Sequence, residues 1–466
     1  MAGGGGDVVP VSPRTQQPSR GGRRGHRQKA AWLPLDIIIA EIAARSDPAT
    51  FVRCAATCRD ARRCITEDPS LRGRLRIRDT ERFVLPLLRG HLAGITTYTG
   101  GEKTDVYMVD TTTAADATRL VKATRLVKAT FAEAHQTLRS VVSMDSRGGL
   151  VLVRATPTTT QNKTHYQRQL LVCNLAARRC LALPPEPAFP YADWSTDWSW
   201  STCGVQYVLL VGGSDGEGAG ADAAVGRPFQ VLKSKLVLSQ YRSYRCLLVH
   251  TFSSEHGAWS PLTEIPTPNL HGSSGKRYQR PLVVGDVVHW LCLTDSWSYM
   301  LMLHVRAARV NVTALPGSFP PRRQEHPYLL ASATAGGNPV VLVADADRIS
   351  AWEQSKHTKM WKPRPQVVIE NETILGFKDD GLAELLEKER RWGKRKHVPE
   401  LLWFGERSGA VLLKIDVYYG YCLLWLDLHS KKIVRCFSPD RRMQVYCPYE
   451  VDLSSWVPTF SNAVTL

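Results

Sequence analysis

Apolar residues in the larger part of the chain come in short runs. From Ser140 onward, runs of about four to eight residues rich in Val, Leu, Tyr and Trp alternate with Gly, Pro, Asn, Asp or Ser. GGLVLVRA, YVLLVGG and DVVHWLCLT are examples. Such residues fit a pleated, half-buried backbone. The pattern predicts many short β-strands over residues 140–462.

Several of these runs share one shape, in which an apolar strand ends in a polar turn and resumes toward a proline or an aromatic residue. LLVHTFSSEHGAWSPL and LLWLDLHSKKIVRCF are two of them. Successive hairpins of this kind close by radial repetition into a β-propeller. We therefore expect a large antiparallel β domain at 140–462, built as a propeller, with a pair of β-sandwiches as the alternative. A helix-forming stretch at about 380–397 is expected to be an insertion in this domain.

The region at 31–77 has a helical period instead. Ile38 and Ile42 stand four residues apart, so that both lie on one apolar face. Asp47 is suited to cap the next helix, and Pro48 to begin it, because a first helical turn does not use the N–H that proline lacks. The pattern predicts three short helices. The predicted fold class is α+β, mainly β.

A bundle of roughly forty residues has too little interior to cover its own apolar faces. We therefore expect another molecule to cover part of the ridge formed by the early isoleucines.

Two segments flank this bundle. Residues 1–30 are rich in Gly, Pro, Ser and Arg, and such a composition cannot bury enough apolar surface to fold. They are predicted to be a disordered basic arm. Residues 78–139, which contain a tandem hexapeptide at 118–129, are predicted to be a connector that packs on the β domain.

The composition adds expectations about the environment of the protein. No stretch of the 466 residues reaches ~18 uninterrupted apolar positions, and the N-terminus lacks the apolar core of a secretory signal. The 11 cysteines are scattered and lack the paired spacing of a zinc site. They are expected to be reduced thiols in a cytoplasmic or nuclear protein without membrane association.

The formal net charge of +17 raises nucleic acid as a partner. Six basic residues lie between Arg14 and Lys29, and much of the remainder is dispersed along the chain. Regular basic and aromatic stacking motifs are lacking. Nucleic acid is therefore not the expected partner. A propeller that binds nucleic acid through its basic arm is the alternative function.

No pattern in the sequence assembles a catalytic or cofactor site. The glycine-rich stretch Gly212–Gly226 is not followed by Lys-Ser/Thr, and neither HExxH nor GxSxG occurs. His289 beside Trp290 is expected to be a core or edge-strand histidine. Asp345 and Asp347 are expected to be solvated at a strand end. We predict no catalytic residue, no metal and no cofactor.

Aromatic residues interleaved with polar ones form the candidate binding surface. Trp194, Trp198 and Trp200 lie in DWSTDWSWSTC, and Trp297 and Tyr299 lie in TDSWSYM. Trp and Tyr anchor protein interfaces more often than other residues do. The alternative is that they cover the edge of a sheet.

Within 33–75, the stretches LPLDIII, EIAARSDPATFVRCAATCR and ITEDPSLR resemble the F-box, a three-helix motif. Together with LLWFGERSGAVLL and YCPYEVDLSSWVPTF further on, these stretches are similar to those of the large group of grass F-box proteins that carry a C-terminal F-box-associated β domain. Ala61 departs from the motif, because many F-boxes have Trp there. By this resemblance the adaptor-binding residues are Leu33, Pro34, Ile37, Ile38, Ile42, Val52, Cys58 and Arg59.

The resemblance implies a function without catalysis by this chain. An F-box docks on a Skp-type adaptor and through it on a cullin, so that the β domain would bring a target protein to a Skp-cullin-F-box ubiquitin ligase. It also explains the unfinished ridge, because adaptor helices complete the apolar surface of an F-box.

Overall fold

The computed structural model describes most of the chain from Phe83 to Glu450. The described residues are 83, 85–97, 103–110, 120–121, 138–157, 169–175, 179–190, 205–212, 225, 228–238, 245–267, 280–293, 298–320, 326–355, 358, 360–375, 398–417, 420–437 and 443–450. The predicted basic arm, the F-box at 31–77 and the inserted helix at about 380–397 lie outside them.

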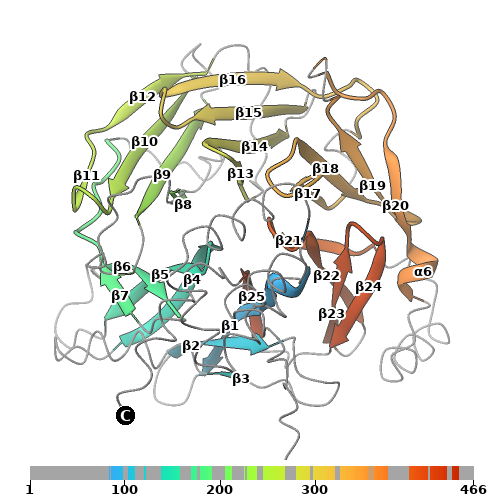
Figure 1. Cartoon of the computed structure of the whole chain (residues 1–466), viewed down its shortest axis with the longest axis horizontal. Coiled ribbons are helices and arrows are strands. Elements are labelled where there is room, and N and C mark those ends of the chain that lie inside the picture. Colours follow the sequence, from blue (N-terminus) through green and yellow to red (C-terminus); the bar gives the residue numbers. More distant parts are fainter. Residues whose placement is uncertain are drawn as a thin grey trace, which may run out of the picture.

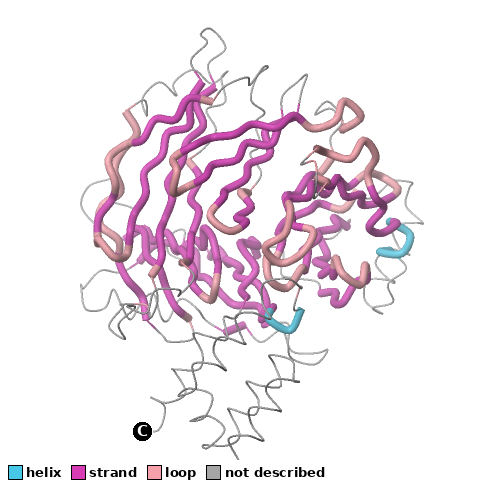
Figure 2. Tube along the Cα trace, turned by 45° about the horizontal axis from the view of Figure 1, so that its top comes forward, coloured by secondary structure: helices cyan, strands magenta, loops and turns pink. Residues whose placement is uncertain are grey.

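The described strands form six antiparallel blades around a central axis (Figure 1). The predicted β-propeller is thus confirmed, and the alternative of two β-sandwiches is wrong. Most of the described residues lie in strands, and there are two short helices among them, η1 (Leu85–Leu87) and α6 (Asn371–Leu375) (Figure 2). Neither of these described helices has the length and apolar character needed to cross a bilayer.

Blades 1 and 2 share one continuous sheet, because Thr104 of blade 1 pairs with Ser140 of blade 2. From the axis outward, blade 1 contains β25 (Met443–Glu450), β1 (Leu88–Thr97), β2 (Lys103–Asp110) and β3 (Leu120–Val121). Blade 2 contains β4 (Leu138–Arg147), β5 (Leu150–Pro157), β6 (Gln169–Asn174) and β7 (Arg179–Ala182).

In blade 3 the outer position is divided between two short strands, and Pro261, which has no N–H to donate, lies between them. Blade 3 contains β8 (Gln206–Val211), β9 (Phe229–Leu238), β10 (Arg245–Ser253), β11 (Ala258–Trp259) and β12 (Thr263–Pro266). Blade 4 contains β13 (Leu282–Val284), β14 (Val287–Leu293), β15 (Ser298–His304) and β16 (Arg309–Ala314).

The last two blades follow the same order from the axis outward. Blade 5 contains β17 (Tyr328–Ser332), β18 (Pro339–Ala344), β19 (Arg348–Glu353) and β20 (Gln366–Glu370). Blade 6 contains β21 (Glu400–Phe404), β22 (Ala410–Val417), β23 (Gly420–Asp427) and β24 (Lys432–Phe437).

The hydrophobic cores lie between neighbouring blades, since each blade packs both of its faces against others. All six residues of β18 are buried, and so are the last six residues of β23. A strand that is covered on both faces reads as a continuous apolar run, without the alternation of a half-exposed strand. The short apolar runs of the sequence correspond to these doubly covered strands.

Residues 88–97 and 103–110 differ from the sequence expectation of a connector at 78–139. They form β1 and β2, and β1 pairs on its other side with β25 from the end of the described chain. This pairing closes the ring with backbone hydrogen bonds between the two ends of the propeller (Figure 1). The sequence did not indicate it, because β1 has Gly90 and Gly94 in its run and its partner lies far away in sequence.

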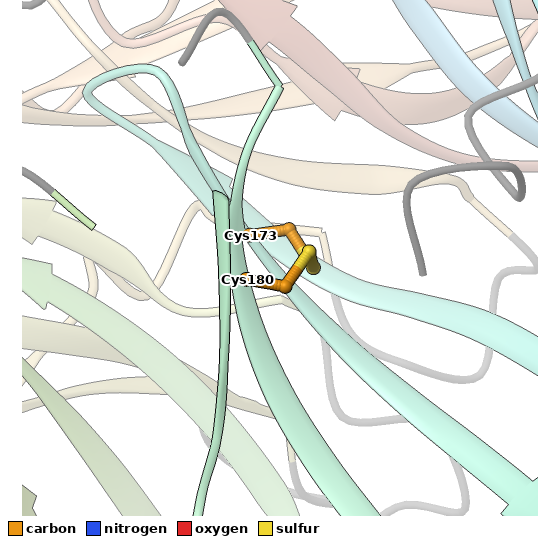
Figure 3. Close-up of a disulfide and its surroundings, with 2 residues drawn as sticks. All are labelled: Cys173 and Cys180. Carbon is orange, nitrogen blue, oxygen red and sulfur yellow. A yellow bond between two sulfur atoms is a disulfide. The ribbon is translucent and has the colours of Figure 1, made fainter. Parts of the chain in front are cut away.

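Cys173 and Cys180 form a disulfide, which corrects the expectation of reduced thiols for this pair. They lie directly opposite each other on β6 and β7, with Cα atoms 4.1 Å apart (Figure 3). Two cysteines at paired positions of a hairpin are brought together by the strand register itself. The other described cysteines are not disulfide-bonded: Cys246, Cys292, Cys422, Cys436 and Cys447.

Candidate functional site

A salt bridge crosses the centre of the ring. Arg147 ends β4 in blade 2, and its Nε lies 2.7 Å from Oε2 of Glu406 in the turn between β21 and β22 of blade 6. The same guanidinium donates to the carbonyl of Leu209 in blade 3. The backbone N–H of Val283 in blade 4 donates to Glu406 Oε1 at 3.2 Å. Four blades therefore meet at one ion pair.

Asp145 supports this ion pair from the same strand. Its carboxylate accepts hydrogen bonds from the backbone N–H groups of Ser146 and Leu209, each at 2.8 Å, and lies 3.5 Å from Arg147. Burial raises the pKa of Asp145 despite the nearby guanidinium. For Arg147, burial disfavours the charge, but Glu406 and Asp145 outweigh this effect and its pKa lies above the ordinary value.

Glu450, the last residue of β25, joins blade 1 to blade 6. Its carboxylate accepts from the N–H of Ser408 at 2.7 Å and from that of Arg407 at 3.1 Å. Burial raises the pKa of Glu450. The β21–β22 turn approaches this carboxylate so closely that a Cβ at Gly405 would collide with Glu450 and Ser408. Glycine is required there to let the turn wrap the carboxylate.

Arg280 is the second arginine at the centre. It precedes β13 of blade 4, and its guanidinium carbon lies 3.2 Å from the ring centroid of Trp403 on β21 of blade 6. Burial lowers its pKa to about 10, although Cys447 and Asp145 oppose this effect. We call the charged residues around the axis the axial cluster: Asp145, Arg147, Arg280, Glu406 and Glu450.

The axial cluster holds charge and offers no activated nucleophile. The Cys447 thiol beside it is buried, 2.9 Å from Ser143 Oγ, and burial raises its pKa to about 12. It is therefore a thiol, not a reactive thiolate, at neutral pH. Across the described parts of the chain, no three His, Cys, Asp or Glu residues are grouped so that they could hold a metal ion. The arrangement is suited to binding a charged group.

The aromatic residues predicted to form a binding surface are only in part described. Trp194, Trp198, Trp200 and Trp297 lie outside the described residues, as do all eight predicted adaptor-binding residues. Tyr299 is described, on β15, and is 6% exposed in the core between blades 3 and 4. Tyr299 is therefore not available to a binding partner, because residues of blades 3 and 4 cover its side chain.

The other polar residues singled out in the sequence have structural places. His289 is buried on β14, next to Trp290, in agreement with a core histidine. Asp345 is partly buried and caps a turn, because its Oδ1 accepts from the N–H groups of Asp347 and Arg348 at 2.8 Å each. Asp347 is exposed, as expected.

Because of its buried histidines, we expect the protein to become less stable as the pH is lowered. Burial lowers the pKa of His289 to about 4 and that of His91 to about 3, whereas an unfolded chain takes up these protons near pH 6.5. Below that pH the unfolded state binds more protons, so the free energy of unfolding decreases as pH falls from about 6.5 to about 4. Urea unfolding at a series of pH values measures the slope.

His289→Gln should make this slope shallower, since glutamine does not titrate. Asp145 and Glu450 act in the opposite direction at acid pH, because their raised pKa values favour proton uptake by the folded state. Both carboxyl groups are present in wild type and in His289→Gln, so their contribution cancels in the difference between the two slopes. An unchanged slope would contradict the assignment to His289.

The sequence held a signal for the axial cluster that pattern analysis did not use. Charged residues stand beside glycine turns at the ends of apolar runs, in DSRGG at 145–149 and in FGERSG at 404–409. A charge at the end of an innermost strand points toward the axis of a propeller. That direction becomes apparent only once the strand is known to be innermost.

Comparisons with known proteins give a family. A family model described as a domain of unknown function (DUF7595) matches residues 106–462. The comparison with curated proteins gives no match.

Among solved structures, hydrazine synthase of Kuenenia stuttgartiensis is similar at 8% identity and a TM-score of 0.44, over 78% of this chain and 47% of that chain. The Dos1 propeller is similar at 10% identity and a TM-score of 0.30, over 66% and 72% of the two chains. The β-propeller domain of the Trilobed protease from Pyrococcus furiosus is similar at 8% identity and a TM-score of 0.28, over 65% and 84%.

Proposed function

This chain belongs to the family of domains of unknown function DUF7595. For this member we propose the function of a substrate-recruiting subunit of a Skp-cullin-F-box ubiquitin ligase. The N-terminal helices would bind a Skp-type adaptor, and the propeller would bind a target protein. Bond chemistry would take place on another polypeptide. The observation that carries the proposal is the apolar ridge of Ile38 and Ile42, in a segment too small to cover it.

The form of the described domain supports a binding role for the propeller. Polar contacts at the axis join five of its six blades, namely blades 1, 2, 3, 4 and 6, so the ring presents a rigid surface. Its buried thiol is not activated, and its central charges other than Arg280 are bound to one another or to backbone groups. Holding a target near a ubiquitin carrier would replace a bimolecular encounter by an effectively intramolecular one.

The junction between the two parts also supports it. Phe83, which precedes η1, packs edge-on against Phe404 with 5.9 Å between ring centroids. Gly409 has a φ of 70°, and a Cβ there would collide with Phe83. Phe83, which follows the predicted N-terminal helices in the sequence, is thus held against a turn of blade 6. An anchor at this point would limit how far a bound target could move from the adaptor.

Co-purification of the full chain with a Skp-type adaptor tests the proposal. Ile38→Asp with Ile42→Asp should abolish capture, because two charges forced into an apolar interface cost on the order of several kcal/mol. Asp36→Asn with Glu41→Gln is the matched control, since both residues lie on the polar face of the same predicted helix, and it should retain capture.

Two results would contradict the proposal. One is a wild-type protein that captures no adaptor, and the other is an isoleucine double variant that captures it fully. Salt-sensitive binding of DNA or RNA that disappears when residues 1–30 are deleted would instead support the alternative function.

A further inference from the structure

Arg280 differs from three partly buried cations of the ring in having no carboxylate partner among the described residues. Among the described residues, its guanidinium stacks on Trp403 and forms no ion pair with a carboxylate, although Asp145 is near enough to act on its charge. Three other cations each have a carboxylate partner. These pairs are Arg147 with Glu406 (2.7 Å), Lys233 with Glu186 (2.9 Å) and Lys414 with Glu400 (3.1 Å).

The guanidinium of Arg280 lies near side chains of two other blades. Its backbone belongs to blade 4, while Trp403 belongs to blade 6 and Cys447 to blade 1, so the side chain extends toward the axis. Arg280 is exposed to solvent in this position. The surroundings disfavour its charge, as the lowering of its pKa to about 10 indicates.

Stacking on an indole face leaves the edge of a guanidinium open. The edge carries N–H donors in a planar fork that matches the two oxygens of a carboxylate or phosphate. A ligand oxyanion that reached Arg280 would gain a bidentate contact and supply the missing counter-charge. The site is therefore ready to accept one anionic group from outside the chain.

We propose that Arg280 binds an anionic side chain, a carboxylate or a phosphate, of the protein target that the propeller recruits. This inference rests on the proposed function and names the chemistry that its binding surface recognises. A polypeptide fits better than a nucleic acid, because Asp145 and Glu406 lie at the same centre and would repel a chain of successive phosphates. A single anionic group would meet this repulsion once, whereas successive phosphates would meet it repeatedly.

Labelling with phenylglyoxal, which modifies arginine side chains, tests this on the full-length protein. Mass spectrometry of the digested protein gives the labelling rate at each arginine. Sodium phosphate and sodium glutarate are the probes, and sodium chloride at equal ionic strength is the reference. Arg280 should be protected several-fold by one or both probes, and the exposed Arg364 should not.

Each outcome of the labelling experiment has a meaning. Protection by phosphate alone assigns a phosphorylated target, and protection by glutarate alone or by both probes assigns a carboxylate-bearing one. If Arg280 were labelled as fast with both probes as it is with sodium chloride, the proposal would be overturned.

A second measurement separates binding from a structural role. Arg280→Gln should leave the Tm of the protein unchanged and should remove the rise in Tm that the protecting probe produces in wild type. Arg364→Gln should keep that rise. A large fall in Tm in Arg280→Gln without probe, or a rise that persists in it, would overturn the proposal. Neither result would bear on adaptor capture, which uses other residues.

Discussion

Arg147→Met is expected to lower the free energy of unfolding by about 3–5 kcal/mol, the usual cost of removing one partner of a buried ion pair. The side chains of Arg147, Glu406 and Asp145 are 15%, 22% and 11% exposed. Without the guanidinium, Glu406 and Asp145 would lose the cation with which they form ion pairs. Urea unfolding measures the loss.

A double variant tests the explanation. Arg147→Met with Glu406→Gln removes both charges of the pair and keeps an acceptor for the N–H of Val283. It should regain a large part of the lost stability, and the cycle gives the coupling between the two residues.

The matched control is Lys362→Met, which breaks the ion pair with Glu353 at the surface, where the lysine is 41% exposed. It should cost less than about 1 kcal/mol. If Arg147→Met cost no more than this control, the axial ion pair would not stabilise the ring.

Trp425→Ala should destabilise the protein by about 3–5 kcal/mol, as expected for the loss of a fully buried tryptophan. Trp425 lies on β23, is 1% exposed and belongs to the core shared by blades 6, 1 and 2. This core also contains Cys447 and Tyr449 of β25, so the cavity would form beside the strand that closes the ring. Denaturant unfolding measures the change.

Two further substitutions calibrate this result. Trp425→Phe keeps an aromatic ring in the core and should cost less than Trp425→Ala. Met360→Ala removes a side chain that is 67% exposed and should change stability by no more than about 0.5 kcal/mol. A Trp425→Ala protein as stable as Met360→Ala would contradict the view that this core holds the closure.

Much of the fold could be predicted, because the hairpin pattern is local. Each polar turn of the sequence is flanked by strands that pair with each other, as β10 and β11 or β15 and β16 do. The first blade was missed for the opposite reason. Its inner strand β25 and its second strand β1 come from opposite ends of the described chain, and glycines in β1 resemble a linker.

The candidate site was less predictable than the fold. Sequence patterns drew attention to the tryptophans at 194–200, while the axial cluster was not foreseen. Arg147 and Glu406 are 259 positions apart, and Ser143 and Cys447 are 304 apart. No local pattern relates such residues, since only closure of the ring brings the ends of the innermost strands together.

The sequence by itself determined the strands, their pairing into hairpins and the repetition that favours a propeller, because strand and turn preferences act between near neighbours. It also predicts the apolar ridge on which the proposed function depends. Only the tertiary structure decided that β25 completes the first blade, that Cys173 bonds to Cys180, and that Arg280 faces the axis without a carboxylate partner among the described residues. The burial of a side chain and the presence of a counter-charge depend on residues that only the whole ring brings together. For that reason no single stretch of the chain predicts them.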